Sequence, residues 1–482
     1  MVSCSNGIIE NEKWMGDFYE MNKEIEDSNK LANQKIPKLL FNMAVPGILA
    51  QVINLLYNMI DRMFIGRIPD VGALALTGVG VTFPIVILIA AFAALVSMGA
   101  APRASIALGK NDKEEAEKIL GNSTSALILV SVFITGFILF FGEDILKIFG
   151  ASSDTIVYGL QYIRIYAFGT IFVQLALGLN AFITAQGFAK TSMITISIGA
   201  ILNLILDPIL IFGLNMGVKG AATATVISQA ASAIFVLSFL VGKKTNLKIK
   251  LKNMRLEKRV ILPSLVLGLS PFIMQFTESI LAVVFNSSLQ KYGGDLAVGT
   301  MTILTSVMQF SMMPLIGLTQ GSQPIISYNY GANNMDRVKD SFKLLVLTAL
   351  TYSTLLWLAI MIQPSMFARI FTNDPALIKM VIPSLRIFMS MSFLFSIQIA
   401  CQQTFISLGN AKVSVFLALL RKVILLIPLI FIMPRIFTEN PVQAIFYAEP
   451  ISDTISVLVT SILAFISFRQ IFNQESSPAL EK

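Results

Sequence analysis

The chain has 482 residues, of which 55% are hydrophobic and 13% are charged, and its formal net charge is +8. A soluble domain has about a quarter of its residues charged, so this composition excludes an ordinary soluble globule. The chain has no histidine and two cysteines, Cys4 and Cys401, which excludes zinc–histidine sites and thiolate metal clusters. It also lacks a phosphate-binding loop motif, because Gly187–Ser192 has the wrong spacing for one.

Long apolar runs recur along the chain, and many approach the roughly 20 residues that cross a ~30 Å hydrocarbon core as a helix. We therefore predict an all-α integral membrane protein with twelve transmembrane helices. In the first half the predicted spans are 38–66, 71–101, 116–142, 155–186, 190–214 and 217–242. In the second half they are 259–290, 296–330, 338–363, 376–409, 411–434 and 441–468.

Lys and Arg favour one side of this topology by roughly three to one, which is the positive-inside pattern. Both chain ends are therefore predicted to face the cytoplasm, and the positive charge needs no nucleic-acid partner. The predicted division is a cytoplasmic tail 1–37, a six-helix lobe 38–242, a basic cytoplasmic linker 243–258, a second six-helix lobe 259–468 and a cytoplasmic tail 469–482. The first tail lacks the apolar core of a signal peptide. The linker is predicted to lie against an anionic leaflet.

One sequence pattern occurs twice. Met98–Gly109 (MGAAPRASIALG) and Gln320–Gly331 (QGSQPIISYNYG) match at four positions when offset by 222 residues. The matched pairs are Gly99 and Gly321, Pro102 and Pro324, Ser105 and Ser327, and Gly109 and Gly331; the same offset relates Gly187–Ser192 to Gly409–Ser414 and Arg164 to Arg386. The prolines are predicted to bend their helices, Gly109 and Gly331 to act as C-terminal caps, and Arg164 and Arg386 to have structural roles.

The repeat indicates two equivalent six-helix bundles. Each bundle has an even number of spans, so both enter the membrane in the same direction, and a pseudo-two-fold axis along the membrane normal relates them. A cavity between two such bundles, opened alternately to either side, is typical of a transporter. Because the chain has no ATP-binding loop, an ion gradient would have to drive any uphill transport.

Ionisable residues inside the hydrocarbon are costly and are usually functional. The acids within the predicted spans are Asp61, Asp207, Glu278, Glu449 and Asp453. Asn203 and Asp207 lie one turn apart on one helix face, and Pro208, to which we assign a structural role, frees a backbone carbonyl one turn back. Carboxylate, amide oxygen and carbonyl together favour a pocket for a hard cation or a proton.

Two further oxygen-bearing residues are predicted at the depth of Asp207. At 1.5 Å rise per residue, Asp61 and Thr225 lie with it about 8–10 Å below the outer surface. Three helices would thus contribute oxygen atoms to one level of the membrane. The alternative interpretation is structural: Asp207 would cap its helix at the proline, and Asp61 would pair with Arg62.

At these residues the chain resembles the MATE (multidrug and toxic compound extrusion) family of secondary transporters. The resemblance covers residues 36–468 and rests on six segments: Pro46–Gly66, Met98–Gly109, Ile201–Phe212, Gly217–Gln229, Ser270–Ile280 and Gln403–Ser414. The stretches LYNMIDRMFIG and NLILDP are similar to a bacterial drug-exporting branch called MepA-like. The resemblance implies twelve helices in two lobes, and exchange of sodium ions or protons for organic cations.

The resemblance also assigns individual residues. The family's amino-lobe cation site maps onto Asp61, Asn203, Asp207 and Thr225, which would bind sodium if the chain is sodium-coupled. Glu278 matches an acid that many members place in the seventh span. The tenth predicted span has no carboxylate, and Leu425 and Leu429 stand opposite Asn203 and Asp207 in the repeat. Coupling is therefore predicted in the first lobe alone, with Asp207 as the coupling carboxylate.

The predicted function is secondary active multidrug efflux, in which sodium ions or protons are exchanged for amphipathic, mainly cationic drugs by alternating access. Glu278 and Gln275 are predicted to bind substrate, with a lone Glu278 carboxylate attracting cationic drugs. The chain is predicted to be no enzyme and to need no cofactor beyond the coupling ion. We expect a monomer in a bacterial inner membrane whose partners are drugs and lipids.

Two other functions remain open at this point. A lipid-linked precursor flippase of the same broad superfamily would favour fourteen spans and a strongly basic cavity. A membrane scaffold or receptor without transport would not need Asp207 and Glu278 in the hydrocarbon.

Arg421 and Lys422 lie within the eleventh span, opposite the uncharged Gly199 and Ala200 in the repeat. An unpaired cation there would be costly. Arg421 is therefore predicted to have a structural role, pointing into the second lobe and pairing with Glu278 or Glu449. Lys422 is predicted to reach the interface or a wet crevice.

Overall fold

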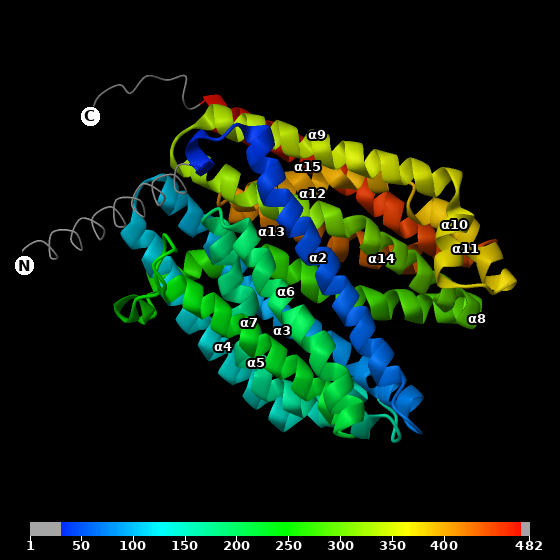
Figure 1. Ribbon diagram of the computed structural model, residues 1–482. Helices are drawn as coiled ribbons and strands as arrows, with labels where there is room; N and C mark the ends of the chain where they lie inside the picture. The colour runs from blue at the N-terminus through cyan, green and yellow to red at the C-terminus, as the bar shows by residue number, and fades with distance from the viewer. Residues whose placement is uncertain (1–29, 474–482) are drawn as a thin grey trace, which may run out of the picture.

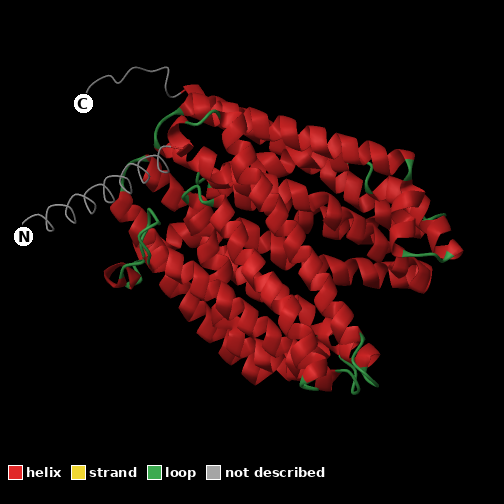
Figure 2. Cartoon of the chain, viewed as in Figure 1, coloured by secondary structure: helices red, strands yellow, loops and turns green. Residues whose placement is uncertain are grey.

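The computed structural model describes residues 30–473. Most of the predicted tails 1–37 and 469–482, together with Cys4, therefore lies outside the described residues. Within the described range every regular element is a helix, and Figure 2 shows no strand there. The prediction of an all-α protein is confirmed.

The first lobe contains six long helices. They are α2 (Ile36–Gly66), α3 (Gly72–Gly109), α4 (Lys113–Ile148), α5 (Ile156–Ala185), α6 (Ala189–Pro208) followed by the π-helix η1 (Ile209–Gly213), and α7 (Val218–Val241). Four of these helices (α2, α5, α6 with η1, and α7) begin and end within two residues of the predicted spans. Helices α3 and α4 extend several residues beyond their predicted spans.

The second lobe follows a short 3-10 helix, η2 (Leu251–Met254). Its helices are α8 (Lys258–Gly331), α9 (Met335–Ile362), α10 (Pro364–Phe371), α11 (Pro375–Phe388), α12 (Ser392–Ser407), α13 (Ala411–Leu419), the π-helix η3 (Leu420–Leu426), α14 (Ile427–Ile436) and α15 (Pro441–Asn473). Figure 1 shows the two lobes as separate bundles, with α2 running across the face that joins them.

Twelve membrane spans follow from these helices. In the described residues ten helices are long and apolar enough to cross a membrane, and the pair α11–α12, bent by 49°, makes one more. The 74-residue α8 counts once among the ten, yet Gly294 (φ 61°, ψ −159°) breaks its helical backbone. Because glycine readily adopts this left-handed φ and the break separates two helices of more than 30 residues each, α8 consists of two spans, and the predicted number of twelve is confirmed.

The sequence repeat is present in the three-dimensional contacts. Oγ of Ser105 donates to the carbonyl oxygen of Ala185 at 3.1 Å, and Oγ of Ser327 donates to that of Ser407 at 2.8 Å. The two donor residues are 222 positions apart in the chain, and so are the two acceptor residues. Equivalent helices therefore make equivalent contacts in the two lobes.

Gly109 and Gly331 are not the helix caps that we predicted. The left-handed residues after α3 and α8 are Asn111 (φ 59°) and Asn333 (φ 57°). Instead, the two glycines lie where α3 and α8 cross, and a Cβ on either would overlap a backbone carbonyl of the other helix. Gly99 and Gly268 make a second such crossing, and Gly47 and Gly317 a third.

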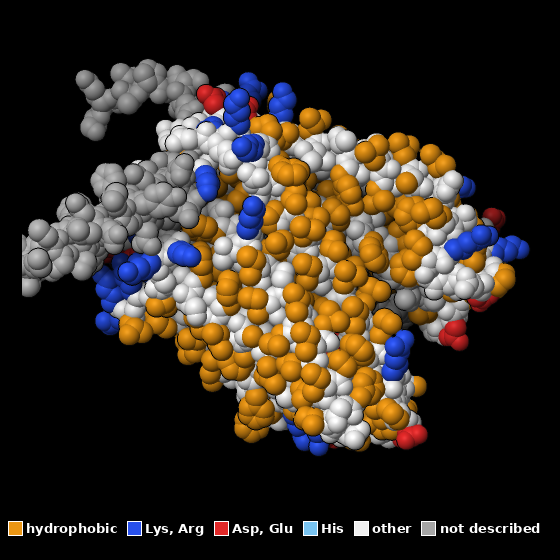
Figure 3. Space-filling model, viewed as in Figure 1, with side chains coloured by type: hydrophobic (Ala, Val, Ile, Leu, Met, Phe, Trp, Pro, Cys, Tyr) orange, Lys and Arg blue, Asp and Glu red, His pale blue; other side chains and the backbone are white. Residues whose placement is uncertain are grey.

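These crossings all lie in the halves of α2, α3 and α8 that are predicted to be cytoplasmic. Toward the other end the lobes diverge, and a notch separates them (Figures 1 and 3). The lobes are thus packed backbone to backbone on one side and open on the other. Figure 3 also shows hydrophobic side chains covering the middle of the visible face, with Lys and Arg near its ends, as expected of a protein surrounded by lipid.

The linker between the lobes is docked on the first lobe. Oε1 of Gln186 accepts from the backbone N–H of Leu247, and Nζ of Lys250 pairs with Oε2 of Glu117 at 2.5 Å. Most of its basic side chains remain exposed. The prediction that they lie against an anionic leaflet on the cytoplasmic side stays a prediction.

Candidate functional site

Three helices bring the predicted cation-site residues together. Asp61 lies on α2, Asn203 and Asp207 lie on α6, and Thr225 lies on α7. Nδ2 of Asn203 donates to Oδ1 of Asp207 at 3.2 Å and to Oγ1 of Thr225 at 3.5 Å. The carboxyl groups of Asp61 and Asp207 interact with each other. We call these four residues the amino-lobe cluster; cation binding by it stays a prediction.

Two carboxyl oxygens of the amino-lobe cluster are buried without a hydrogen-bond partner. They are Oδ1 of Asp61 and Oδ2 of Asp207. Because nearly all buried polar atoms in proteins have a partner, these oxygens favour a bound cation, proton or water. A sodium ion would also need the oxygen of the Asn203 amide, which a half-turn of that amide brings to the place of its nitrogen.

The donor set narrows what the amino-lobe cluster can hold. In the described part of the chain no group of three or more His, Cys, Asp and Glu side chains is suited to a metal ion. Two carboxylates, an amide and a hydroxyl are hard oxygen donors, which suit a hard cation or a proton rather than a soft metal ion.

Arg62 does not form the ion pair with Asp61 that the structural interpretation requires, although its charge acts on that carboxyl. Its guanidinium lies over the ring of Phe83, 4.4 Å from the centroid. Adjacent residues of a helix do not face each other, so Asp61 turns toward α6 while Arg62 turns toward α3.

Three tyrosines border the amino-lobe cluster and were missed by the sequence analysis. Tyr57 lies one turn before Asp61 on α2, and Tyr162 and Tyr166 stack on α5 with ring centroids 5.9 Å apart. Tyr57 and Tyr162 both interact with Asp61, and the Tyr162 hydroxyl contacts Thr225. The i, i+4 spacing of Tyr162 and Tyr166 within a predicted span is the sequence pattern from which these tyrosines could have been found.

Pro208 is the last residue of α6. The π-helical turn η1 follows it at once, and the backbone N–H of Leu214 donates to the carbonyl oxygen of Ile209 at 2.8 Å. Such π-helical turns are frequent at functional sites. Asp207 therefore lies at the junction of two helical geometries.

A cavity of about 740 Å³ lies beside the amino-lobe cluster. Its wall comes from α2, α3, α5, α6, α7 and both arms of α8, and it includes Asn203 and Thr225. Amide side chains supply much of its polarity: Gln51, Asn54, Asn58, Asn180, Asn203, Gln229, Gln275, Gln309, Gln320 and Gln323. Among the described residues that line it there is no Asp or Glu, and Arg62 is the one charged side chain.

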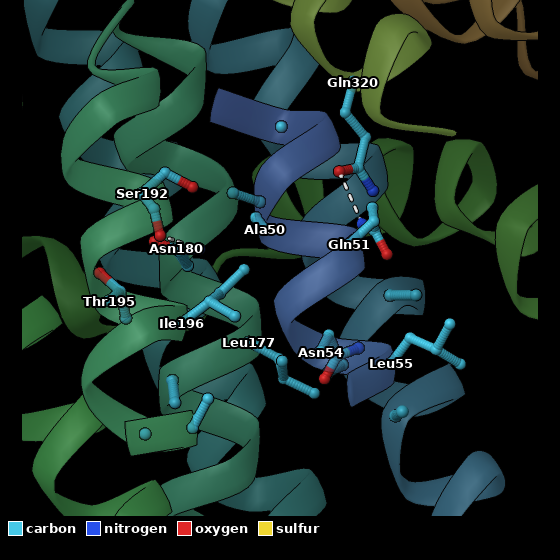
Figure 4. Close-up of a pocket in the computed structure, with 18 of the residues that line it drawn as sticks. Ala50, Gln51, Asn54, Leu55, Leu177, Asn180, Ser192, Thr195, Ile196 and Gln320 are labelled. Atoms are coloured by element: carbon cyan, nitrogen blue, oxygen red, sulfur yellow. Dashed lines mark hydrogen bonds between the residues drawn. The ribbon is translucent and has the colours of Figure 1, made fainter. Parts of the chain in front are cut away.

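Figure 4 shows how the two lobes meet across this cavity. Nε2 of Gln51 on α2 donates to Oε1 of Gln320 on α8 at 3.2 Å. Asn54 lies one turn further along α2, while Asn180 and Ser192 line the opposite side. The Gln51–Gln320 hydrogen bond therefore joins the lobes across the cavity, near the middle of α2.

Glu278 does not have the environment that was predicted for it. Its carboxylate forms an ion pair with Lys422, whose Nζ also donates to the carbonyl oxygen of Met274 at 2.9 Å. Glu278 is absent from the residues that line the cavity, whereas Gln275 is present. The prediction of a lone carboxylate facing the cavity was wrong, and substrate binding by Gln275 stays a prediction.

Arg421 pairs with Glu449, as predicted, and also with Asp453, both at 2.6 Å. Lys422 is buried, so the prediction that it reaches the interface was wrong; a wet crevice beside its partner Glu278 stays a prediction. Arg164 and Arg386, related by the repeat, are both exposed, and Nε of Arg386 donates to the carbonyl oxygen of Met361 at 3.2 Å. This bond ties α11 to α9.

The model of the MatE family matches residues 46–209 and 271–432, one stretch in each lobe. The chain belongs to the MatE family. MATE proteins are transporters, so this chain is a multi-pass membrane transporter and not an enzyme.

Known proteins agree with this assignment. The chain is 25% identical over 427 residues to the multidrug export protein MepA of Staphylococcus aureus (strain bovine RF122 / ET3-1), covering 88% of this chain and 94% of the relative. It is 25% identical over 400 residues to MepA of Staphylococcus haemolyticus (strain JCSC1435), covering 83% and 87%. A crystal structure of MATE in the bent conformation superposes with a TM-score of 0.88 at 21% identity, covering 94% of this chain and 99% of that one. The chain is thus a MepA-like MATE transporter.

Proposed function

We propose that this MATE protein exports amphipathic drugs, organic cations among them, in exchange for sodium ions or protons by alternating access. The observation that carries the proposal is the amide-lined cavity, which shares Asn203 and Thr225 with a cluster containing two carboxylates. The names of the staphylococcal relatives, multidrug export proteins, support it.

The shared residues supply a physical link between ion and drug. A cation bound between Asp61 and Asp207 would draw the Asn203 amide away from its present partners, because a sodium ion prefers the amide oxygen. That movement would change the cavity wall beside the ion. Ligand-driven switching requires only that the ion bind one conformation a few kcal/mol more tightly than the other.

The cavity wall suits hydrogen-bonding, amphipathic molecules. Ten amides can each donate and accept, and methionines such as Met59, Met193 and Met313 provide adaptable apolar contacts. Since no carboxylate is found among the described residues of the cavity wall, a cationic drug would bind through its shape, amide dipoles and apolar surface rather than through an ion pair. Selection for cations is therefore expected to be modest.

The flippase alternative receives less support. A flippase for lipid-linked precursors would need cations to bind pyrophosphate, and the described cavity wall offers Arg62 alone, already stacked on Phe83. We also propose that the protein is a monomer in a bacterial inner membrane and that both chain ends face the cytoplasm. This orientation rests on the positive-inside pattern.

The purified full chain in proteoliposomes tests this function. We expect uptake of ethidium into inside-out vesicles when sodium ions or protons are more concentrated in the lumen than outside, so that the ion leaves as ethidium enters, and no uptake without a gradient. The gradient that works identifies the ion. Equal ethidium uptake with and without either gradient would contradict ion-coupled export, and movement of a fluorescent lipid-linked sugar instead would favour the flippase.

A further inference from the structure

A second group of buried charges lies in the other lobe, away from the cavity. Arg421 on η3 donates from Nε to Oδ1 of Asp453 and from Nη2 to Oε1 of Glu449, each at 2.6 Å. All three side chains are only about 5% exposed, and the Phe395 ring lies 4.0 Å from the guanidinium carbon. We call Arg421, Glu449 and Asp453 the carboxyl-lobe triad.

The carboxyl-lobe triad has one negative charge too many. Two carboxylates share one guanidinium, and the neighbouring cation Lys422 is already paired with Glu278. Lys422 and Glu278 are the other charged groups that act on the triad, and the pair they form is neutral. An uncompensated charge is costly inside hydrocarbon, and two carboxylates that share one site do not readily both ionise.

The remaining helices around the triad do not supply the missing positive charge. On α12 the titratable group is the buried thiol of Cys401, which cannot become a cation. On α11 Arg386 is exposed and bonded to Met361, and on α14 Arg435 lies in the last turn. Among the described residues of these helices, no further cation balances the triad.

Polar oxygens without partners extend from the triad along α15. Ser456 and Thr460 follow Asp453 at three and seven positions, which places them on the same helix face. Their hydroxyl oxygens are fully buried and lack a hydrogen-bond partner, as does Oε1 of Gln398 on the adjacent α12. Buried unpartnered oxygens usually contact ordered water, so this face offers a hydrated path toward the predicted cytoplasmic end of α15.

The triad is separate from the substrate cavity. No residue of α12, η3 or α15 is among the described residues that line that cavity. Arg421 also lies on a π-helical segment, a geometry that is frequent where a helix changes shape in function. A drug-binding role therefore does not explain the charges, whereas binding of a small ion does.

We propose that the carboxyl-lobe triad is a proton-binding site, in which Glu449 and Asp453 hold one proton between them while Arg421 stays charged. The proton joins one carboxylate oxygen to give a neutral carboxyl, and it leaves through water on the Ser456–Thr460 face. Loss of the proton leaves a net negative charge at η3, which favours a conformation that hydrates the triad. This site goes beyond the ion exchange proposed for the first lobe and does not depend on it.

Infrared spectroscopy of the reconstituted full chain tests the proposal directly. The starting variant is Asp61→Asn with Asp207→Asn, which removes the two carboxyls of the amino-lobe cluster. At neutral pH in potassium buffer we expect the carbonyl band of a protonated carboxylic acid, shifted in deuterated water. Adding Glu449→Gln or Asp453→Asn should remove the band, because an amide then replaces the shared acid. Glu143→Gln, on the exposed Glu143 of α4, is the matched control and should leave it.

Each other outcome overturns the proposal. Absence of the band in the starting variant would mean that both triad carboxylates are ionised. Persistence of the band in both Glu449→Gln and Asp453→Asn would place the proton elsewhere. A band that is absent in potassium, with sodium-dependent thermal stabilisation that Glu449→Gln abolishes, would make sodium the occupant. Failure of both single variants to fold would also contradict it, since an amide closely replaces a neutral carboxyl.

Discussion

Lys422 and Glu278 lie 144 positions apart in the chain, and only the packing of η3 against α8 brings them together. The sequence analysis identified both as charges within spans but could not pair them, because no spacing rule relates residues so distant. The amino-lobe cluster was easier to predict, since Asn203 and Asp207 are one turn apart and the depth of Asp61 and Thr225 follows from helical rise. The neighbouring tyrosines were not predicted as part of this site, because aromatic residues are common in membrane spans.

The pairing of Glu278 changes what its substitution should do. Breaking a fully buried ion pair costs roughly 3–5 kcal/mol; because the Glu278 side chain is 59% exposed, we expect Glu278→Gln to destabilise the protein by about 1–2 kcal/mol. The thermal-unfolding midpoint of purified protein measures this loss. Transport of cationic and neutral drugs should fall together, since Glu278 does not line the cavity.

A double variant separates charge pairing from substrate binding. Glu278→Gln with Lys422→Met removes both charges, and the midpoint should return toward that of the unmodified protein. Selective loss of cationic drug transport in Glu278→Gln, with an unchanged midpoint, would restore the substrate role that the structure argues against.

At the scale of helices, span positions were predictable because about 20 apolar residues are needed to cross hydrocarbon. Helix crossings were not predictable, because they depend on which helix lies opposite. Gly109 and Gly331 illustrate this: both follow the pattern of a C-terminal cap, yet asparagines adopt the left-handed conformation and the glycines allow close approach of α3 and α8. The π-helical turns η1 and η3 likewise have no simple sequence pattern.

The glycine crossings should hold the predicted cytoplasmic side closed. In Gly331→Ala the new Cβ would overlap the Ile106 carbonyl. Overpacking of this kind costs about 1–3 kcal/mol. A cost of about 2 kcal/mol would lower the population of this conformation by roughly tenfold or more. Spin labels at Lys113 and Asp336, both exposed at the starts of α4 and α9, should report a longer mean distance.

Gly136→Ala is the matched control for this element. Gly136 lies in α4, and a Cβ added there would meet no atom of another described helix within 4 Å. Alanine should therefore leave the label distance unchanged and slightly stabilise the helix. An unchanged distance in Gly331→Ala as well would show that the crossing does not determine which side is closed.

For the whole molecule, alternating access requires a conformation that exposes the cavity to one side while the glycine crossings close the other. The cavity, the Gln51–Gln320 bond and the amino-lobe cluster all lie between these two ends. Composition, repeat and charge asymmetry were sufficient to predict the two-lobe architecture. They were not sufficient to predict the lining of the cavity, because that depends on how each helix is rotated about its axis.

We propose that Asp207 couples the ion to export without being needed for drug binding. Asp207→Asn tests it in one paired measurement on the purified full chain: equilibrium binding of ethidium in detergent, and gradient-driven ethidium uptake in proteoliposomes. Because Asp207 is outside the cavity wall while Asn203 is part of it, we predict binding within about threefold of the unmodified protein, equivalent to less than about 1 kcal/mol, and loss of gradient-driven uptake. Asn203→Ala should lose less of the gradient-driven ethidium uptake than Asp207→Asn. Ethidium uptake against a gradient by Asp207→Asn would contradict the coupling role of Asp207.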